Sequence, residues 1–129
     1  MNLLKGKKAI VTGGAQGLGA AISEHLAEAG CDVVIWDINR EVAEKTASEI
    51  AGRTGCVVSC DVVDVTNADR VHEAVDTAVE RLGWLDIMVC NAGILISGDS
   101  ITLDASAWRK VLEVDLTGYF LCAREAARV

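Results

Sequence analysis

The sequence has no proline among its 129 residues, and aromatic residues make up only 4% of it. Roughly six prolines would be expected at the usual frequency of about 5%. Turns and helix ends must therefore be built from glycine, asparagine and aspartate. Histidine occurs only at positions 25 and 72. Because no histidine lies near Cys56 and Cys60 to complete a ligand set, we expect no metal site.

Positive charge is also scarce. Twelve lysines and arginines stand against 19 aspartates and glutamates, which gives a formal net charge of −7. This balance argues against nucleic acid or an anionic membrane as partner, since both favour a basic patch. No apolar run approaches the roughly 18 residues that span a membrane. The lysines of residues 5–8 precede an apolar segment that glycines interrupt, so it is not a signal peptide.

The five cysteines form no Cys-x-x-Cys pair, and their number is odd. Four of them lie in or beside apolar runs that resemble strands. We interpret them as buried, reduced thiols, which is typical of a cytoplasmic protein.

Short apolar runs alternate with amphipathic segments along the whole chain. The strand-like runs cover residues 9–11, 31–37, 56–63 and 85–90. Apolar residues recur at helical spacing after each run, and Gly30, Gly52 and Gly83 are expected to end the first three helices. Residues Trp108, Val111, Leu112, Tyr119 and Cys122 are expected to share one face of the last helix. This order predicts an α/β fold with one parallel sheet covered on both faces.

A glycine-rich loop, "TGGAQGLG" at residues 12–19, separates the first strand from the first helix. The amino end of a helix offers free N–H groups to an anion, and glycine lets the backbone approach a phosphate closely. A P-loop is excluded because Ala20 stands where that motif needs lysine. The strict Gly-x-Gly-x-x-Gly pattern is not matched either, so the loop alone does not identify the ligand.

The second strand ends in an acid, Asp37, which lies 18 residues after Gly19. A carboxylate at this point accepts hydrogen bonds from an adenosine ribose and repels a 2′-phosphate, which favours NAD over NADP. Two other interpretations stay open. Asp37 is a simple turn or cap residue in one, and Arg40 binds the 2′-phosphate of NADP in the other.

Four segments together resemble the short-chain dehydrogenase/reductase family. They are "TGGAQGLG" (12–19), "DVT" (64–66), "CNAG" (90–93) and "VLEVDLTGYF" (111–120). They follow the family's order over nearly the whole chain. The resemblance implies a Rossmann-type, doubly wound parallel sheet with strand order 3-2-1-4 in the part present and with the C-terminal strands missing. It also implies NAD as the cofactor.

The same resemblance implies a role for each matching residue. The pyrophosphate would be faced by Gly13, Gly17, Leu18 and Gly19. The adenosine ribose would lie beside Asp37 and Ile38, and the adenine beside Asp64, Val65 and Val114. The nicotinamide-side ribose would be faced by Asn91, Ala92 and Gly93. Gln16 occupies a place where relatives that use NADP often carry a basic residue.

Two positions depart from the family pattern. Cys90 replaces the first asparagine of the Asn-Asn-Ala-Gly motif, and Asp115 stands where the catalytic tetrad has asparagine. The spacing from Val111 and Tyr119 predicts that Asp115 lies on the inward face of its helix. Burial would raise the pKa of such an acid, so we expect a conserved geometry with an altered pH dependence.

The family's Tyr-x-x-x-Lys motif is not found, because Ala123 stands four residues after Tyr119. We therefore expect residues 1–129 to be the NAD-binding half of a longer enzyme, truncated within its last helix and inactive alone. The intact enzyme would interconvert a secondary alcohol and a ketone by hydride transfer, and would be a homo-oligomer paired through that helix. Segment 118–125 resembles dehydrogenases that act on sugar alcohols and sugar phosphates.

Two other classes remain. A complete, non-catalytic dinucleotide-binding or interaction module is favoured by the missing tyrosine and lysine, whereas an unpaired sheet edge counts against it. A Rossmann-like methyltransferase also combines a glycine loop with an acid after the second strand, but segments 64–66 and 90–93 disfavour it.

Overall fold

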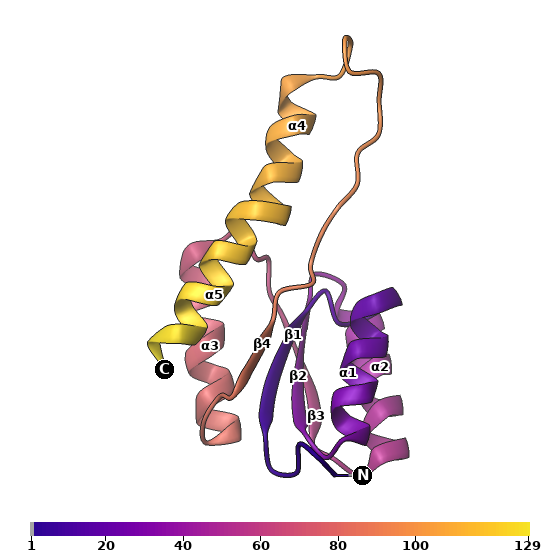
Figure 1. Ribbon diagram of the computed structural model, residues 1–129, viewed down its shortest axis with the longest axis vertical. Coiled ribbons are helices and arrows are strands. Elements are labelled where there is room, and N and C mark those ends of the chain that lie inside the picture. Colours follow the sequence, from indigo (N-terminus) through magenta and orange to yellow (C-terminus); the bar gives the residue numbers. More distant parts are fainter. Residues whose placement is uncertain (1) are drawn as a thin grey trace.

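The computed structural model describes residues 2–129 and contains one sheet of four parallel strands in the order β3-β2-β1-β4 (Figure 1). The strands are β1 (Lys8–Thr12), β2 (Asp32–Asp37), β3 (Val58–Val62) and β4 (Ile87–Val89). The helices are α1 (Gly17–Glu28), α2 (Arg40–Thr54), α3 (Ala68–Leu82), α4 (Ala105–Leu112), the π-helical segment η1 (Glu113–Thr117) and α5 (Gly118–Arg128). The Rossmann-like architecture and strand order expected from the sequence are confirmed.

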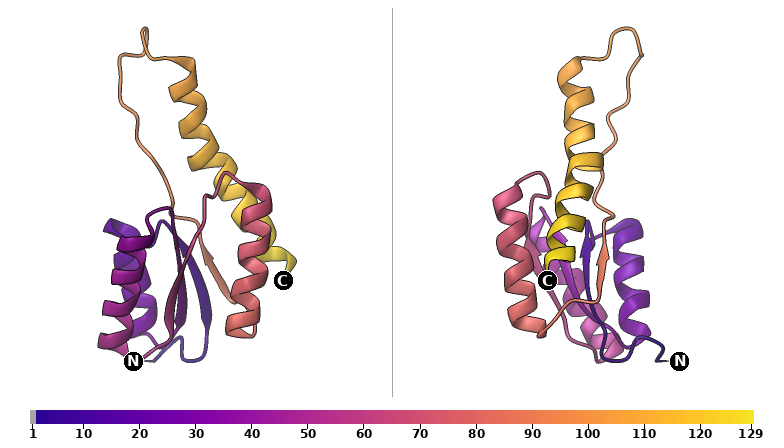
Figure 2. Two further views of the ribbon diagram at one scale, coloured as in Figure 1. Left: turned by 180° about the vertical axis from the view of Figure 1, so that it is seen from behind. Right: turned by 60° about the vertical axis from the view of Figure 1, so that its left-hand side comes forward.

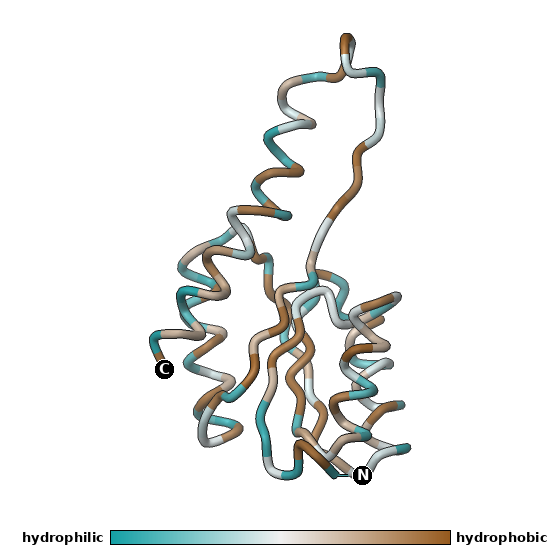
Figure 3. Tube along the Cα trace, in the orientation of Figure 1, coloured by the Kyte–Doolittle hydropathy of each residue, from teal (hydrophilic) through white to brown (hydrophobic). Residues whose placement is uncertain are grey.

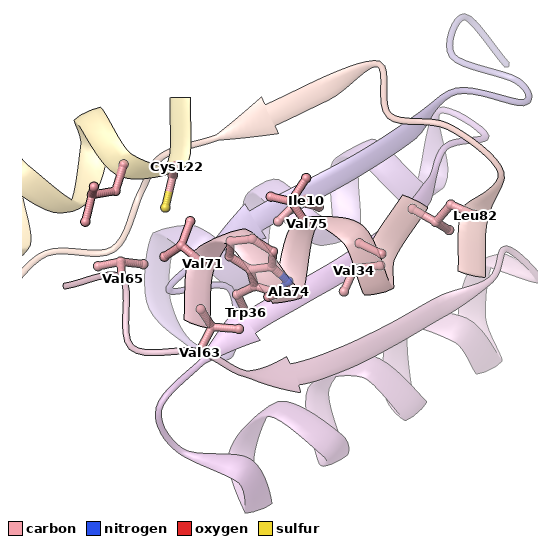
Figure 4. Packing of buried hydrophobic residues seen from close by; sticks show 12 residues of the cluster. Ile10, Val34, Trp36, Val63, Val65, Val71, Ala74, Val75, Leu82 and Cys122 are labelled. Carbon is pink, nitrogen blue, oxygen red and sulfur yellow. The ribbon is translucent and has the colours of Figure 1, made fainter. Parts of the chain in front are cut away.

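Helices cover both faces of the sheet, α1 and α2 on one side and α3 and α5 on the other (Figures 1 and 2). The central strand residues are therefore apolar in both directions. Ile10, Val34 and Trp36 pack under α3 and α5 (Figure 4), whereas Val11 and Ile35 pack under α1 and α2. All five are fully buried, which explains why the strands read as continuous apolar runs rather than as alternating ones.

In this chain without proline, asparagine side chains cap the starts of helices and glycine ends them. The Oδ1 atom of Asn39 accepts a hydrogen bond from the Val42 N–H at the start of α2, and Asn67 does the same for Arg70 at the start of α3. Helix α2 ends at Gly55, whose φ of 73° is left-handed. The prediction that Gly52 ends this helix is wrong, because only Gly55 adopts the conformation that turns the chain away.

The loop after β4 and helix α4 project together beyond the sheet (Figures 1 and 2). Apolar residues lie along this projection, as Figure 3 shows. The prediction of one shared apolar face for the last helix is wrong. Trp108 and Tyr119 are 62% and 43% exposed, whereas Cys122 is buried against the sheet. The π-helical turn of η1 changes the helical register between them, and only α5 lies over the sheet.

Among residues 2–129, no helix has the length and apolar character needed to cross a membrane.

Candidate functional site

The glycine loop contains positions at which a side chain would be strained or would clash with neighbouring atoms. Gly13 and Gly17 have φ values of 62° and 57°, the left-handed region that glycine adopts without strain. A β-carbon on Gly19 would overlap the carbonyl oxygen of Gly13 and lie 2.6 Å from Nδ2 of Asn91. One on Gly13 would lie 2.9 Å from the Cα atom of Ala92. The first turn of α1 therefore packs directly on the backbone of the loop and beside the segment that follows β4.

Side chains at the end of β1 tie the loop to β4. Buried Thr12 accepts hydrogen bonds at Oγ1 from the N–H groups of Asn91 (2.9 Å) and Ala92 (3.0 Å). In return, Nδ2 of Asn91 donates to the carbonyl oxygens of Thr12 (3.1 Å) and Gly13 (3.2 Å). These bonds join segments almost 80 residues apart in sequence and fix the "CNAG" segment beside the glycine loop.

The other side of the loop is tied to β2 and α2. Oδ2 of Asp37 accepts a hydrogen bond from the Ala15 N–H at 3.1 Å, and Oδ1 accepts one from the Asn39 N–H at 3.1 Å. The hydroxyl of Thr46, on α2, donates to the Ala15 carbonyl oxygen at 2.6 Å. Asp37 therefore makes the turn contact that its position suggested, and it also anchors the glycine loop.

A cleft of about 860 Å³ opens along the carboxyl ends of the strands. It is lined by all thirteen residues for which the sequence predicts cofactor contacts, from the glycine loop (Gly13, Gln16, Gly17, Leu18, Gly19), the ends of β2 and β3 (Asp37, Ile38, Asp64, Val65), the segment after β4 (Asn91, Ala92, Gly93) and η1 (Val114). Their contact with a cofactor stays a prediction, but the structure brings them into one cavity.

Six further residues line this cleft and were missed by sequence reasoning. They are Val63, Thr66, Ile94, Ile96, Lys110 and Glu113. Val63, Thr66 and Ile94 directly adjoin predicted residues, so extending each motif by one residue would have found them. Glu113 likewise adjoins a predicted residue, Val114. Lys110 reaches the cleft because α4 runs alongside it, and no local sequence signal marks it.

Asp115 lies outside the set of residues that line the cleft, and the prediction that it lies on an inward face of its helix needs correction. It is exposed rather than buried on an inward face, so the expected loss of solvation does not apply. Its Oδ1 atom accepts a hydrogen bond from the Ile94 N–H at 2.9 Å. The π-helical turn rotates Asp115 toward the loop after β4, where it holds the backbone that follows Gly93. This contact orients the backbone after Gly93, and a catalytic role of Asp115 stays a prediction.

The charges in the cleft are mainly negative. Asp37, Asp64 and Glu113 line it together with a single basic side chain, Lys110. An anion bound at the glycine loop would therefore depend chiefly on backbone N–H groups and the α1 dipole.

Burial raises the pKa of the Cys90 thiol beside the cleft, and it raises that of Cys122 to about 12. Both thiols stay protonated at neutral pH and are poor nucleophiles.

The residues present fit a dinucleotide. The cleft volume lies within the range of small-molecule sites. A β-carbon on Gly17 would meet no atom within 4 Å, so the loop leaves open space at the amino end of α1. An acid stands at the end of the neighbouring strand, as ribose binding requires. Within residues 2–129, no group of three or more His, Cys, Asp or Glu side chains is placed to hold a metal ion.

A Rossmann-like sheet with a glycine loop and a cleft at its carboxyl edge defines a nucleotide-binding class of α/β protein. The family model for short chain dehydrogenases matches residues 7–129. The chain belongs to the short-chain dehydrogenase family, whose members typically bind a nicotinamide dinucleotide.

Relatives and solved structures agree with this assignment. An uncharacterized oxidoreductase of Mycobacterium bovis is 40% identical over 129 residues, which is 99% of this chain and 51% of that protein. Cis-4-hydroxycyclohexanecarboxylate dehydrogenase of Sinomonas cyclohexanicum is 43% identical, over 93% of this chain and 48% of that protein. The crystal structure of a short-chain dehydrogenase/reductase from Mycobacterium marinum superposes with a TM-score of 0.94 at 34% identity, covering 98% of this chain and 51% of that one. The chain spans about half the length of the curated relatives it matches.

Proposed function

We propose that this chain forms the NAD-binding part of an oxidoreductase that interconverts a secondary alcohol and a ketone. The observation that carries the proposal is the cleft, in which the glycine loop, the β2 acid and the segment after β4 meet. When bound, the nicotinamide ring supplies or accepts the hydride of such a reaction. Cis-4-hydroxycyclohexanecarboxylate dehydrogenase, whose name denotes a secondary alcohol as substrate, supports this substrate class.

The chain's own residues would bind and orient the cofactor. The N–H groups of the glycine loop and of the first turn of α1 would hold the pyrophosphate, and Asp37 would accept hydrogen bonds from the adenosine ribose. Asp64 and Val65 would border the adenine. Residues 91–93 would support the nicotinamide side, held in place by Thr12 and, through Ile94, by Asp115.

We place the proton-transfer residues of the reaction outside these 129 residues. Tyr119 is the only tyrosine, it does not line the cleft, and Ala123 stands where a lysine partner would be needed. The relatives are about twice as long as this chain, which supports an activity that belongs to a longer protein. The narrower substrate class, a sugar alcohol or sugar phosphate, rests on segment 118–125 and is part of the proposal.

We also propose that the protein is a cytoplasmic homo-oligomer. Trp108, Leu116 and Phe120 on the last helical stretch are each about 60% exposed, which supports pairing through this surface. The five cysteines are free thiols, which supports a reducing compartment.

The proposal is tested by calorimetric titration of the chain with NADH, NADPH and S-adenosylmethionine. We expect saturable binding of NADH, weaker binding of NADPH and none of S-adenosylmethionine. Binding without turnover of alcohols or ketones is expected for these 129 residues, and it is also what a non-catalytic dinucleotide-binding module would show. Turnover by a longer form of the chain would separate the two. The absence of NADH binding would contradict both, and saturable S-adenosylmethionine binding would favour a methyltransferase.

Asp37→Asn is expected to reduce the preference for NADH over NADPH about tenfold. The substitution removes the negative charge that repels a 2′-phosphate and weakens the bonds to the ribose; a tenfold change equals about 1.4 kcal/mol. The measurement is the ratio of the two dissociation constants.

Asp99→Asn is the matched control for Asp37→Asn. Asp99 also accepts a hydrogen bond from the N–H two residues ahead, Ile101, but it does not line the cleft. Its substitution should leave the ratio unchanged. If Asp37→Asn also leaves it unchanged, Asp37 does not select the cofactor.

A further inference from the structure

The peptide groups around Ala15 are held from outside the glycine loop. Ala15 is 2% exposed, its N–H donates to Asp37 and its carbonyl oxygen accepts the proton of Thr46. The Gly14 N–H donates to the Trp36 carbonyl oxygen at 3.3 Å. The outer turn of the loop is therefore fixed by β2 through backbone and carboxylate contacts, and by α2 through one hydroxyl.

The Thr46 bond differs from those of other helical threonines in this chain. Thr54 on α2 and Thr77 on α3 donate to the carbonyl oxygen four residues earlier in their own helices, at 2.8 and 2.9 Å. This local bond is the usual outcome for a threonine inside a helix. Thr46 instead donates at 2.6 Å to a residue 31 positions away. The short distance and the buried acceptor indicate a specific link between α2 and the loop.

This link determines the direction of a peptide group beside the cleft. In a trans peptide the C=O and the following N–H point to opposite sides. Because the Ala15 carbonyl points to Thr46, the N–H of Gln16 is directed away from α2. Gln16 lines the cleft and is the N-cap residue of α1, with no side-chain capping bond of its own. Thr46 does not line the cleft, so any effect on a ligand must pass through Ala15.

We propose that Thr46 is a positioning residue that holds the glycine loop in its pyrophosphate-binding conformation through the Ala15 carbonyl. The inference deepens the proposed function and rests on it, since the loop must bind a dinucleotide for Thr46 to matter. Without the hydroxyl, the Ala15–Gln16 peptide can rotate, and each ligand that contacts the loop must first restore its orientation. Ligands that lack phosphate should be insensitive to this change.

The test compares Thr46→Val with Thr46→Ser, which keeps the hydroxyl, and with Thr54→Val, which removes a hydroxyl from the same helix far from the loop. Dissociation constants are measured for NADH by calorimetry and for adenosine by NMR titration. Thr46→Val is expected to weaken NADH binding about 5- to 10-fold, the size of one hydrogen bond. Adenosine binding should not change. Thr46→Ser should restore NADH binding, and Thr54→Val should not weaken it.

The outcomes separate the inference from the proposed function. If the unmodified chain does not bind NADH, the proposed function fails and the inference fails with it. If it binds NADH and Thr46→Val binds equally well, only the inference is overturned. Equal weakening of NADH and adenosine by Thr46→Val would show general disorder instead of loop positioning. Failure of Thr46→Ser to restore binding would also overturn the inference, since the serine hydroxyl preserves the donor.

Discussion

Gly19→Ala is expected to abolish measurable NADH binding and to lower the free energy of unfolding by about 3 kcal/mol, the upper part of the usual range for overpacking. The alanine β-carbon would overlap the Gly13 carbonyl oxygen and press on Asn91 Nδ2. The atom that it meets first belongs to the backbone, which cannot rotate away as a flexible side chain does. The first turn of α1 must therefore move off the loop, and the N–H groups proposed to hold the pyrophosphate move with it.

Gly52→Ala is the matched control for this experiment. Gly52 lies inside α2, its φ is not positive and a β-carbon there would meet no atom within 4 Å. Alanine should therefore stabilise the chain by about 0.5–1 kcal/mol through helix propensity and leave NADH binding unchanged. Urea denaturation and calorimetric titration measure both effects. A Gly19→Ala chain with unaltered NADH affinity would show that the first turn of α1 does not form the binding site.

Thr12→Val is expected to lower the free energy of unfolding by about 4 kcal/mol. Valine has the shape of threonine but cannot accept the hydrogen bonds from the Asn91 and Ala92 N–H groups. Thr12 is 1% exposed, so little water can replace its oxygen. The two N–H groups are partly buried, and a buried N–H left without a partner costs about 1–3 kcal/mol. The "CNAG" segment should also shift, which predicts weaker NADH binding in the folded fraction.

Thr12→Ser distinguishes the contribution of the Thr12 hydroxyl to stability from that of its methyl group. Serine keeps the acceptor and removes one methyl, so we expect a loss of only about 1 kcal/mol. The comparison uses the midpoints and slopes of urea denaturation for the three chains. If serine destabilised the chain and valine did not, packing of the methyl group, and not the hydrogen bonds from the segment after β4, would hold Thr12 in place.

The architecture followed from short-range patterns in the sequence. The runs at 31–37 and 56–63 were located within a few residues of β2 and β3. The central strand β2 is apolar because it is buried on both faces, whereas the edge strand β3 is only partly buried and also carries Ser59 and Asp61. Helix ends were less certain. The difference between Gly52 and Gly55 as the end of α2 depends on which glycine adopts a left-handed φ, and the local sequence does not show this.

The cleft could be anticipated for a topological reason. Parallel strands bring their carboxyl ends to one edge of the sheet, so residues that follow β1, β2, β3 and β4 must meet there. Lys110 and Glu113 could not be anticipated in this way, because they approach from α4 and η1. The orientation of Asp115 depended on the π-helical turn, which a regular helical spacing from Val111 does not reveal.

The sequence by itself determined the α/β alternation, the glycine loop, the acid at the end of the second strand and the family to which these motifs point. The glycine loop and the acid depend on residue type and on spacing within about 20 residues, and the alternation and the family depend on the order of such short segments along the chain. Only the tertiary structure decided which groups hold the loop, because Thr12, Thr46 and Asn91 act on backbone atoms that lie 31 to 80 residues away along the chain. Such hydrogen bonds depend on the packing of the helices and the register of the sheet, and both arise only when the whole chain has folded.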